Sequence, residues 1–174
     1  FGEIGKKGVL ALMCDSTNAE RAGFTMSEKT VGKTFDNIFH DHQNNRIIVA
    51  TFASNVDRVQ QIINTAYKFG RKVVVEGRSM VNIISTASEL GYLKIPDNTL
   101  IEIEQLKNYP DEKTVLITTG SQGEPLAALS RMASGMHRKV KIQPNDLIVF
   151  SSNPIPGNEK AVSKVINDLY IQGA

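Results

Sequence analysis

The sequence contains one cysteine, no tryptophan and few aromatic residues, which occupy 6% of its 174 positions. The single cysteine, Cys14, cannot form an internal disulfide, so the chain is not a disulfide scaffold and is typical of a reducing compartment. No apolar run approaches the roughly 20 residues of a membrane-spanning helix, and no charged-then-apolar signal segment opens the chain. We therefore expect a cytoplasmic protein without a membrane partner.

An excess of charge of either sign is also lacking. The chain has 20 basic and 18 acidic residues, a formal net charge of +2, and no run of five like charges. This balance predicts no strong non-specific binding of nucleic acid, although it leaves room for a local basic cleft. With 41% hydrophobic and 22% charged residues, the composition is that of one ordinary globular domain.

What the sequence does contain is an alternation of short β-branched runs with amphipathic helical stretches. Continuous apolar runs indicate strands that are covered on both faces, as in a parallel sheet. The predicted strands cover residues 8–15, 46–52, 72–76, 114–119 and 147–151, with 99–103 as a short edge strand. We therefore expect an α/β fold with a mainly parallel, Rossmann-like sheet flanked by helices.

Residues that favour helix starts separate these strands. Ser, Thr and Asn cap the first turn of a helix, and Pro fits its first position. The predicted starts are a capping box from Thr25 to Glu28, caps at Asn55, Ser79 and Asn158, and Pro125 as a first helical residue.

Polar clusters follow the five main predicted strands. The carboxyl ends of parallel strands share one edge of the sheet, where ligands bind in open α/β folds, and helix N-termini at that edge suit phosphate. The same residue types also serve as caps and in turns, so each cluster has two interpretations. The residues predicted to bind substrate are Ser54, Asn55, Arg78, Ser79, Ser121, Gln122, Glu124, Ser152 and Asn158.

Standard nucleotide and metal motifs are missing. Residues 120–123 lack both the Walker lysine and the spacing of the dinucleotide glycine motif. His40 and His42 follow an amphipathic helix, where the helix dipole favours histidine. We expect His137 in a surface loop and Cys14 in a buried strand. These residues do not make a closed zinc site.

A local basic segment contains Arg131, Arg138, Lys139 and Lys141. Such a segment forms either a solvated face or a contact with RNA phosphates. The sequence pattern leaves both interpretations open.

The strand-end clusters lie within longer stretches that together resemble a known family. The stretches are LMCDSTNAERAGFTMSE, ATFASN, GRSM, TTGSQGEPLAALSRMASG and FSSNPIPGNE. GSQGEPLAALSRMA and SSNPIPGNE are the specific ones. The chain resembles ribonuclease J, a bacterial family of the metallo-β-lactamase superfamily with an inserted β-CASP domain. The resemblance implies that residues 1–24 contain a connecting strand and an acidic motif at the boundary with a metallo-β-lactamase domain, and that residues 25–174 form the β-CASP domain.

The resemblance also implies an activity. The family hydrolyses RNA phosphodiesters, 5′ to 3′ from a monophosphorylated end and also internally, in RNA decay and maturation. It uses two zinc ions to activate water. The family's H-x-H-x-D-H motif is absent here, so the zinc ligands would lie mostly outside this chain. We therefore expect the isolated chain to bind no zinc, to be inactive and to form an RNA-binding wall of the active-site cleft.

Asp15 matches the acidic β-CASP motif of the family. The resemblance implies that its carboxylate orients a catalytic histidine outside this chain, which is a sensible role for a carboxylate next to an imidazole. Without the resemblance, the residues favour the other interpretation, in which Asp15 caps the turn through residues 16–18.

Two other classes of function stay open. One is a stand-alone Rossmann-like ligand-binding module without hydrolytic activity, and the other is an interaction domain. For the full-length protein, the resemblance implies RNA and the metallo-β-lactamase domain of the same chain as partners, and a homo-oligomeric state.

Overall fold

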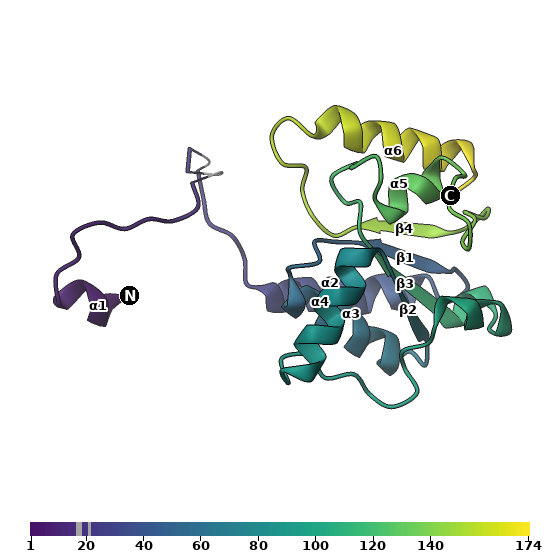
Figure 1. The fold of residues 1–174 in the computed structure, drawn as a ribbon, viewed down its shortest axis with the longest axis horizontal. Helices are drawn as coiled ribbons and strands as arrows, with labels where there is room; N and C mark the ends of the chain where they lie inside the picture. Colours follow the sequence, from purple (N-terminus) through teal and green to yellow (C-terminus); the bar gives the residue numbers. More distant parts are fainter. Residues whose placement is uncertain (17–18, 21) are drawn as a thin grey trace.

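Four parallel strands form the centre of the fold (Figure 1). We describe a computed structural model of the chain, which covers residues 1–16, 19–20 and 22–174. The strands lie in the order β2-β3-β1-β4. Their bounds are β1 Ile47–Ala50, β2 Lys72–Glu76, β3 Thr114–Thr118 and β4 Leu147–Phe150. The predicted parallel α/β sheet is thereby confirmed, and four of the five main predicted strands are present.

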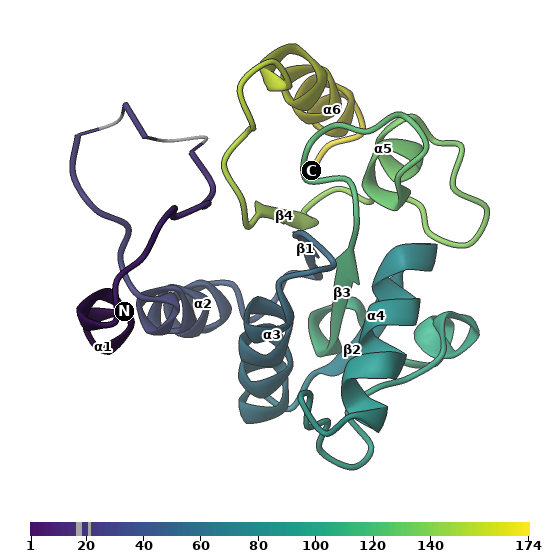
Figure 2. The same ribbon diagram turned by 60° about the vertical axis from the view of Figure 1, so that its left-hand side comes forward.

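Helices connect the strands and cover both faces of the sheet (Figure 2). The α-helices are α1 Gly2–Lys6, α2 Glu28–Asp41, α3 Val56–Lys68, α4 Arg78–Glu89, α5 Ala128–Ala133 and α6 Glu159–Ile171, and the 3₁₀ helices are η1 Ile103–Asn108 and η2 Asp111–Lys113. Among the described residues, no helix is both long and apolar enough to cross a membrane.

The side chains of the strands divide the hydrophobic core into two layers. Successive strand residues point to opposite faces, so Ile47 and Val49 of β1 pack with residues of α2, α3 and α4. Ile48 and Ala50 of the same strand pack with α5 and α6 on the other side. Burial on both faces explains why the strands appear as continuous apolar runs.

The strand register places the carboxyl ends of all four strands at one level. Ala50 lies opposite Thr118 of β3 and Phe150 of β4, and Thr118 also lies opposite Glu76 of β2. The segments that follow the strands therefore start along one edge of the sheet. This confirms the predicted shared edge for four of the five polar clusters.

Two helix starts agree with the predicted type of cap. The Asn55 side chain accepts a hydrogen bond from the Arg58 amide (3.0 Å) and caps α3, as predicted. For α2 the cap is Ser27, which accepts from the Lys29 amide at 3.3 Å, rather than Thr25. Serine and threonine are both good caps, so the sequence indicated the cap but not its position.

The predictions for two other helix starts were wrong. Helix α4 begins after Gly77, not at Ser79, and Gly77 has a φ of 110° that glycine adopts without strain. Helix α5 begins at Ala128 because residues 120–127 form two successive turns, closed by Gly123 and Ala127 amides. Pro125 therefore lies in a turn and not in the helix.

The segment before α2 also differs from the prediction. Residues 8–15 form no strand, and Cys14 is exposed rather than buried. The Met13 side chain is 95% exposed, and Leu10 is fully exposed. A strand requires a neighbour that takes up its backbone hydrogen bonds, and the segment extends away from the sheet (Figure 1). Its apolar composition was therefore not sufficient to make it a strand.

The predicted edge strand over 99–103 is reduced to a single bridge. Val73 of β2 donates to the Thr99 carbonyl (2.8 Å) and accepts from the Ile101 amide (2.9 Å). The chain then turns into η1, so the pairing stops after one residue.

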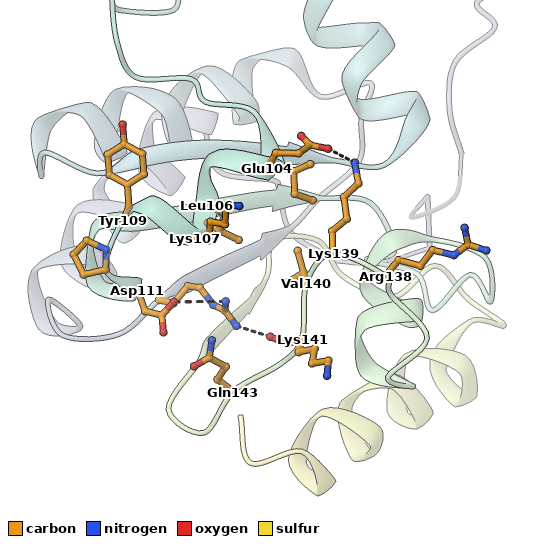
Figure 3. Close-up of a pocket in the computed structure, with 13 residues that line it drawn as sticks. Glu104, Leu106, Lys107, Tyr109, Asp111, Arg138, Lys139, Val140, Lys141 and Gln143 are labelled. Atoms are coloured by element: carbon orange, nitrogen blue, oxygen red, sulfur yellow. Dashed lines mark hydrogen bonds and ion pairs between the residues drawn. The ribbon is translucent and has the colours of Figure 1, made fainter.

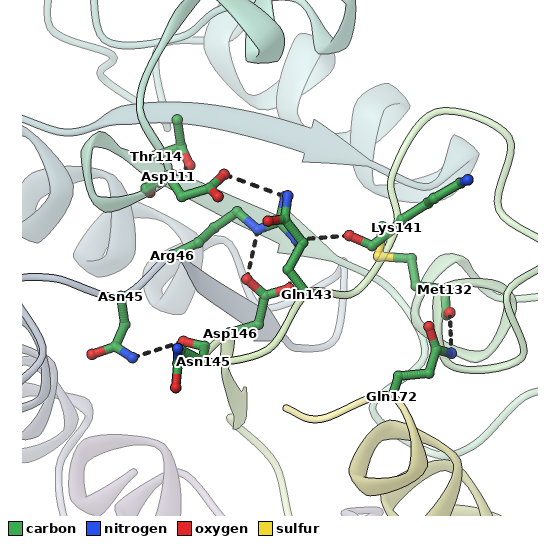
Figure 4. A network of polar contacts seen from close by, with 10 residues as sticks. All are labelled: Asn45, Arg46, Asp111, Thr114, Met132, Lys141, Gln143, Asn145, Asp146 and Gln172. Atoms are coloured by element: carbon green, nitrogen blue, oxygen red, sulfur yellow. Dashed lines mark hydrogen bonds and ion pairs between the residues drawn. The ribbon is translucent and has the colours of Figure 1, made fainter.

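A buried ion pair fixes the amino edge of the sheet (Figure 4). Arg46, directly before β1, donates from Nε to Oδ1 of Asp146 at 2.8 Å and from Nη2 to Oδ2 at 2.5 Å. Arg46 also donates to the Lys141 carbonyl, and the Asp146 carboxylate accepts from the Gln143 amide. Asp146 directly precedes β4, so this bidentate pair holds the edge strand against β1.

Candidate functional site

The carboxyl edge of the sheet brings together the four polar clusters that follow β1 to β4. The predicted site residues there differ in exposure. Ser54, Arg78, Ser79 and Glu124 are exposed, Asn55, Ser152 and Asn158 are half-buried, and Ser121 and Gln122 are buried.

Gln122 joins two of these clusters. Its Nε2 donates to Ser152 Oγ (3.2 Å) and to the Asn153 carbonyl (3.0 Å). Its Oε1 accepts from the Ile155 amide (2.7 Å) and from Asn158 Nδ2 (3.3 Å). The side chain is only 4% exposed. Its amide therefore holds the loop after β4 in place, and Gln122 contributes to the shape of the surface.

The turn after β3 is packed tightly against α6. Gly123 has a φ of 73°, and a Cβ there would lie 2.6 Å from the carbonyl oxygen of Ala161. The Gln122 amide donates to the Glu124 carboxylate at 3.0 Å, and the Gly123 amide donates to the Gly120 carbonyl. These N–H groups are occupied within the turn, which makes them poor phosphate donors unless the turn changes.

Arg58 was missed by the sequence reasoning. It donates to both carboxylate oxygens of Glu28, at 2.9 and 2.8 Å, and to the carbonyl (2.6 Å) and hydroxyl (2.8 Å) of Ser151. It thus ties the start of α2 to the end of β4. A cation in the first turn of a helix opposes the helix dipole, and that unfavourable position was the available sequence signal for a partner.

The same contact changes the acidity of Glu28. The hydrogen bond from Arg58 lowers the pKa of the Glu28 carboxyl below its usual 4.5, against the opposing effect of burial. Glu28 is therefore held as a carboxylate whose charge is balanced by Arg58.

Glu76 and His137 form a second missed pair. His137 is 5% exposed, so the predicted surface loop is wrong. Its Nδ1 accepts from the amides of Lys139 (3.3 Å) and Val140 (3.0 Å), which places the proton on Nε2, 3.0 Å from Glu76 Oε1. Arg131 Nη2 lies 3.6 Å from the same oxygen. The carboxylate that ends β2 thus faces two donors. A charge at the end of an apolar strand was the only sequence signal.

The start of α4 is an open cationic part of this edge. Arg78 and Ser79 are exposed at the first two helical positions, and Gly77 supplies no side-chain cap. Gly77 itself sits against Thr119, since a Cβ there would lie 2.5 Å from the threonine hydroxyl. This contact fixes the direction in which α4 begins beside the end of β3. The arrangement offers a positive helix end and a guanidinium to an anion.

The structure does not bring Asp15 to this edge. Asp15 is exposed in the irregular segment before α2, and that segment lies apart from the sheet (Figure 1). Thr17 and Asn18, which complete its polar cluster, lie outside the described residues. The implied role of Asp15 stays a prediction.

The histidine pair that resembles a metal motif lies at the end of α2, as predicted. His40 Nδ1 is 3.0 Å from Asp41 Oδ1 on an exposed surface, and His42 is the C-terminal cap residue. Over residues 1–16, 19–20 and 22–174, no three His, Cys, Asp or Glu side chains gather as metal ligands would.

Comparisons with known proteins agree with this architecture. Residues 44–169 match the family model described as "Ribonuclease J, beta-CASP domain". The chain is 50% identical over 172 residues to "Ribonuclease J" of Synechocystis sp., covering 99% of this chain and 27% of that protein. It is 47% identical over 172 residues to "Ribonuclease J" of Thermus thermophilus, covering 99% and 30%. It is 44% identical over 174 residues to "Ribonuclease J2" of Bacillus subtilis, covering 100% and 31%.

These matches differ in how much of each protein they cover. The chain spans about 30% of the length of the curated relatives that it matches. All predicted substrate-binding residues, from Ser54 to Asn158, lie inside the matched domain, whereas Asp15 precedes it.

Proposed function

The chain belongs to the ribonuclease J family, and from this premise we propose that the protein hydrolyses RNA phosphodiesters, with the carboxyl edge of this domain as an RNA-binding wall. In the full-length protein the reaction would be both 5′-to-3′ exonucleolytic and endonucleolytic. The observation that carries the proposal is the edge itself. Four strand ends converge there, and Arg78 is exposed at an uncapped helix start.

The charges along this edge suit a polyanion. Two of its carboxylates are paired with cations, Glu28 with Arg58 and Glu76 with Arg131, and Glu76 also accepts a hydrogen bond from the neutral His137. Uncompensated carboxylates would repel phosphate, and compensated ones do so much less. The exposed guanidinium of Arg78 is a bidentate phosphate donor in such a setting.

The proposal includes two zinc ions, bound in the full-length protein. The described residues form no cluster that fits a metal, and a catalytic zinc needs about three protein ligands. We therefore derive no catalytic step from a metal on this chain. The two ions would depend mostly on residues outside it, and the isolated chain would be inactive.

Asp15 would act at the margin of the same cleft. In the proposed role its carboxylate accepts a hydrogen bond from a histidine of the full-length protein and holds that ring in one tautomer. Asp15→Asn keeps the shape and the capping ability but weakens support for a charged ring. We expect single-turnover cleavage to fall by roughly 10–100-fold, with the thermal midpoint almost unchanged. Unchanged cleavage would leave only the capping role.

The RNA-binding wall is tested with Arg78→Gln in the full-length protein. We expect weaker binding of a 5′-monophosphorylated RNA, by about tenfold for one lost charge-assisted contact. Lys33→Gln, which removes an exposed charge from α2, is the control and should bind as wild type. Equal binding by Arg78→Gln and wild type would contradict the proposal for this edge.

A cleavage assay on the same proteins separates the alternatives. A ligand-binding module without hydrolytic chemistry would bind RNA or another ligand and release no nucleotides. An interaction domain would show neither binding nor cleavage of RNA. The proposal also includes a homo-oligomeric protein in the cytoplasm, docked to a metallo-β-lactamase domain of its own chain.

A further inference from the structure

A second basic surface lies away from the carboxyl edge. It is a groove of about 680 Å³ between η1 on one side and residues 138–143 on the other (Figure 3). Its lining includes basic, aromatic and apolar side chains and two carboxylates, Glu104 paired with Lys139 and Asp111 paired with Arg46. Three of its basic residues, Arg138, Lys139 and Lys141, belong to the basic segment for which the sequence left a solvated face and a contact with RNA phosphates open.

Three cations in the groove are available to a ligand. Arg46 forms ion pairs with Asp146 and with Asp111, and Lys139 lies 2.5 Å from Glu104. Within the described part of the chain, no carboxylate forms an ion pair with the other three basic side chains. These are Lys107, Arg138 and Lys141, all exposed. Their charges therefore face solvent.

The rest of the lining suits a base as well as a phosphate. The half-buried Ile103 and Leu106 provide apolar surface. The half-buried ring of Tyr109 stands at the border of the groove (Figure 3), with Lys72 Nζ 5.7 Å from its centroid. Basic groups beside an aromatic ring are the combination that binds single-stranded nucleic acid. A simple anion would need no apolar surface.

The position of the groove connects it to the carboxyl edge. The segment 138–143 follows His137, which contacts Glu76 at the end of β2. The segment then runs toward Asp146, which pairs with Arg46 just before β1. The groove thus follows one face of the sheet from the proposed RNA-binding wall toward the opposite edge.

We infer that this groove binds the part of a single-stranded RNA that extends beyond the carboxyl edge. Its phosphates contact Lys107, Arg138 and Lys141, and a base stacks near Tyr109. The inference rests on the proposed function, because it requires RNA as the substrate. It adds a contact surface that only longer RNAs reach.

The test compares short and long RNA on the full-length protein. The probes are 5′-monophosphorylated oligouridylates of 5 and 20 nucleotides with 2′-O-methyl groups, which resist cleavage. In Lys107→Gln/Lys141→Gln we expect the 20-mer to bind about tenfold more weakly and the 5-mer to bind as before. The slope of log K against log salt should fall by about 1.4, because each neutralised phosphate of a single strand contributes about 0.7.

The matched control is Lys33→Gln/Lys94→Gln, which removes two exposed charges from other surfaces. It should change neither the affinity nor the salt slope. Thermal midpoints of both variants should equal that of the wild type, because exposed lysines contribute little to stability.

The outcomes distinguish the groove from the general function. If the wild type and the groove variant bind the 20-mer equally well, the groove inference is overturned and the proposed function stands. A groove that binds a protein partner would give this result. If both probes lose affinity equally, the lysines do not form an extension site. If the wild type binds neither probe, both proposals are overturned. Displacement of the 20-mer from the groove by uridine monophosphate alone would indicate a free nucleotide and overturn the inference.

A cross-link gives an independent measurement. A 20-mer with 5-iodouridine at successive positions should, on irradiation, cross-link to the peptide that contains Tyr109, and the 5-mer should not. A Tyr109→Leu variant should lose this cross-link. Cross-links confined to the peptides of the carboxyl edge would overturn the inference.

Discussion

The two edges of the sheet are built from polar residues that act in different ways. At the amino edge, the buried Arg46 and Asp146 side chains satisfy each other. At the carboxyl edge, the neutral amide of Gln122 organises the loops, and the neighbouring charged groups are partly exposed. Burying a charge is costly unless it is paired. The charged groups of the amino edge therefore hold strands together, whereas the carboxyl edge has polar groups that can contact a ligand.

The largest expected effect on stability comes from breaking the ion pair at the amino edge. Asp146→Ala removes the bidentate carboxylate partner of Arg46, which is 4% exposed, and leaves only the half-buried Asp111, whose Oδ1 lies 3.6 Å from Arg46 Nη1. We expect a loss of about 3–5 kcal/mol in the free energy of unfolding, measured by chemical denaturation. The control is Asp36→Ala, whose exposed pair with Lys68 is worth about 0–1 kcal/mol. Similar losses of unfolding free energy in the two variants would show that the buried ion pair contributes no more to stability than the exposed one.

The next effect concerns the close packing at the carboxyl edge. Gly123 and Gly135 have the same φ of 73°, but only a Cβ at Gly123 meets backbone atoms of α6. Both alanine variants bear the left-handed penalty of about 1–2 kcal/mol. Gly123→Ala adds overpacking of about 1–3 kcal/mol. Equal denaturation midpoints for the two variants would refute the close contact with α6.

The third effect on stability concerns the Gln122 amide, for comparison with the ion pair of Arg46 and Asp146. Gln122→Ala removes the hydrogen bonds that hold the loop after β4. We expect a loss of about 1–3 kcal/mol, smaller than that of Asp146→Ala because no charge is left buried. Hydrogen exchange at Ile155 should also increase, since its amide loses its partner. Gln43→Ala, at an exposed position, serves as the control. A stable variant with an unchanged Ile155 amide would contradict the organising role of Gln122.

The smallest effect depends on pH. The pKa of Glu28 is lower in the folded protein than its usual 4.5, so its contribution to stability is present above that value. It is lost as the pH falls through the folded pKa. Glu28→Gln should cost less than about 1 kcal/mol at pH 7, since the carboxylate is partly exposed. The difference from wild type should vanish in strong acid. Glu3→Gln, in the exposed α1, is the control and should leave the free energy of unfolding at pH 7 within about 0.5 kcal/mol of wild type.

The strands show how far the sequence predicts the fold. The predicted runs 72–76 and 147–151 match β2 and β4 to within one residue, because residues covered on both faces must be apolar throughout. Residues 8–15 have the same appearance but are exposed and form no strand. An apolar composition shows that a segment tends to be buried. Whether it becomes a strand depends on a neighbouring strand to pair with, and only the tertiary structure supplies that neighbour.

The candidate site shows the same division. The sequence by itself determined which residue types follow each strand, and parallel strands place those residues at one edge. Only the tertiary structure decided which of them are exposed, such as Arg78, and which are used internally, such as Gln122. It also decided the pairs of Arg58 with Glu28 and of His137 with Glu76. These partners are 30 and 61 residues apart along the chain, and periodicity and capping report only on near neighbours, so long-range pairing appears only when the sheet is assembled.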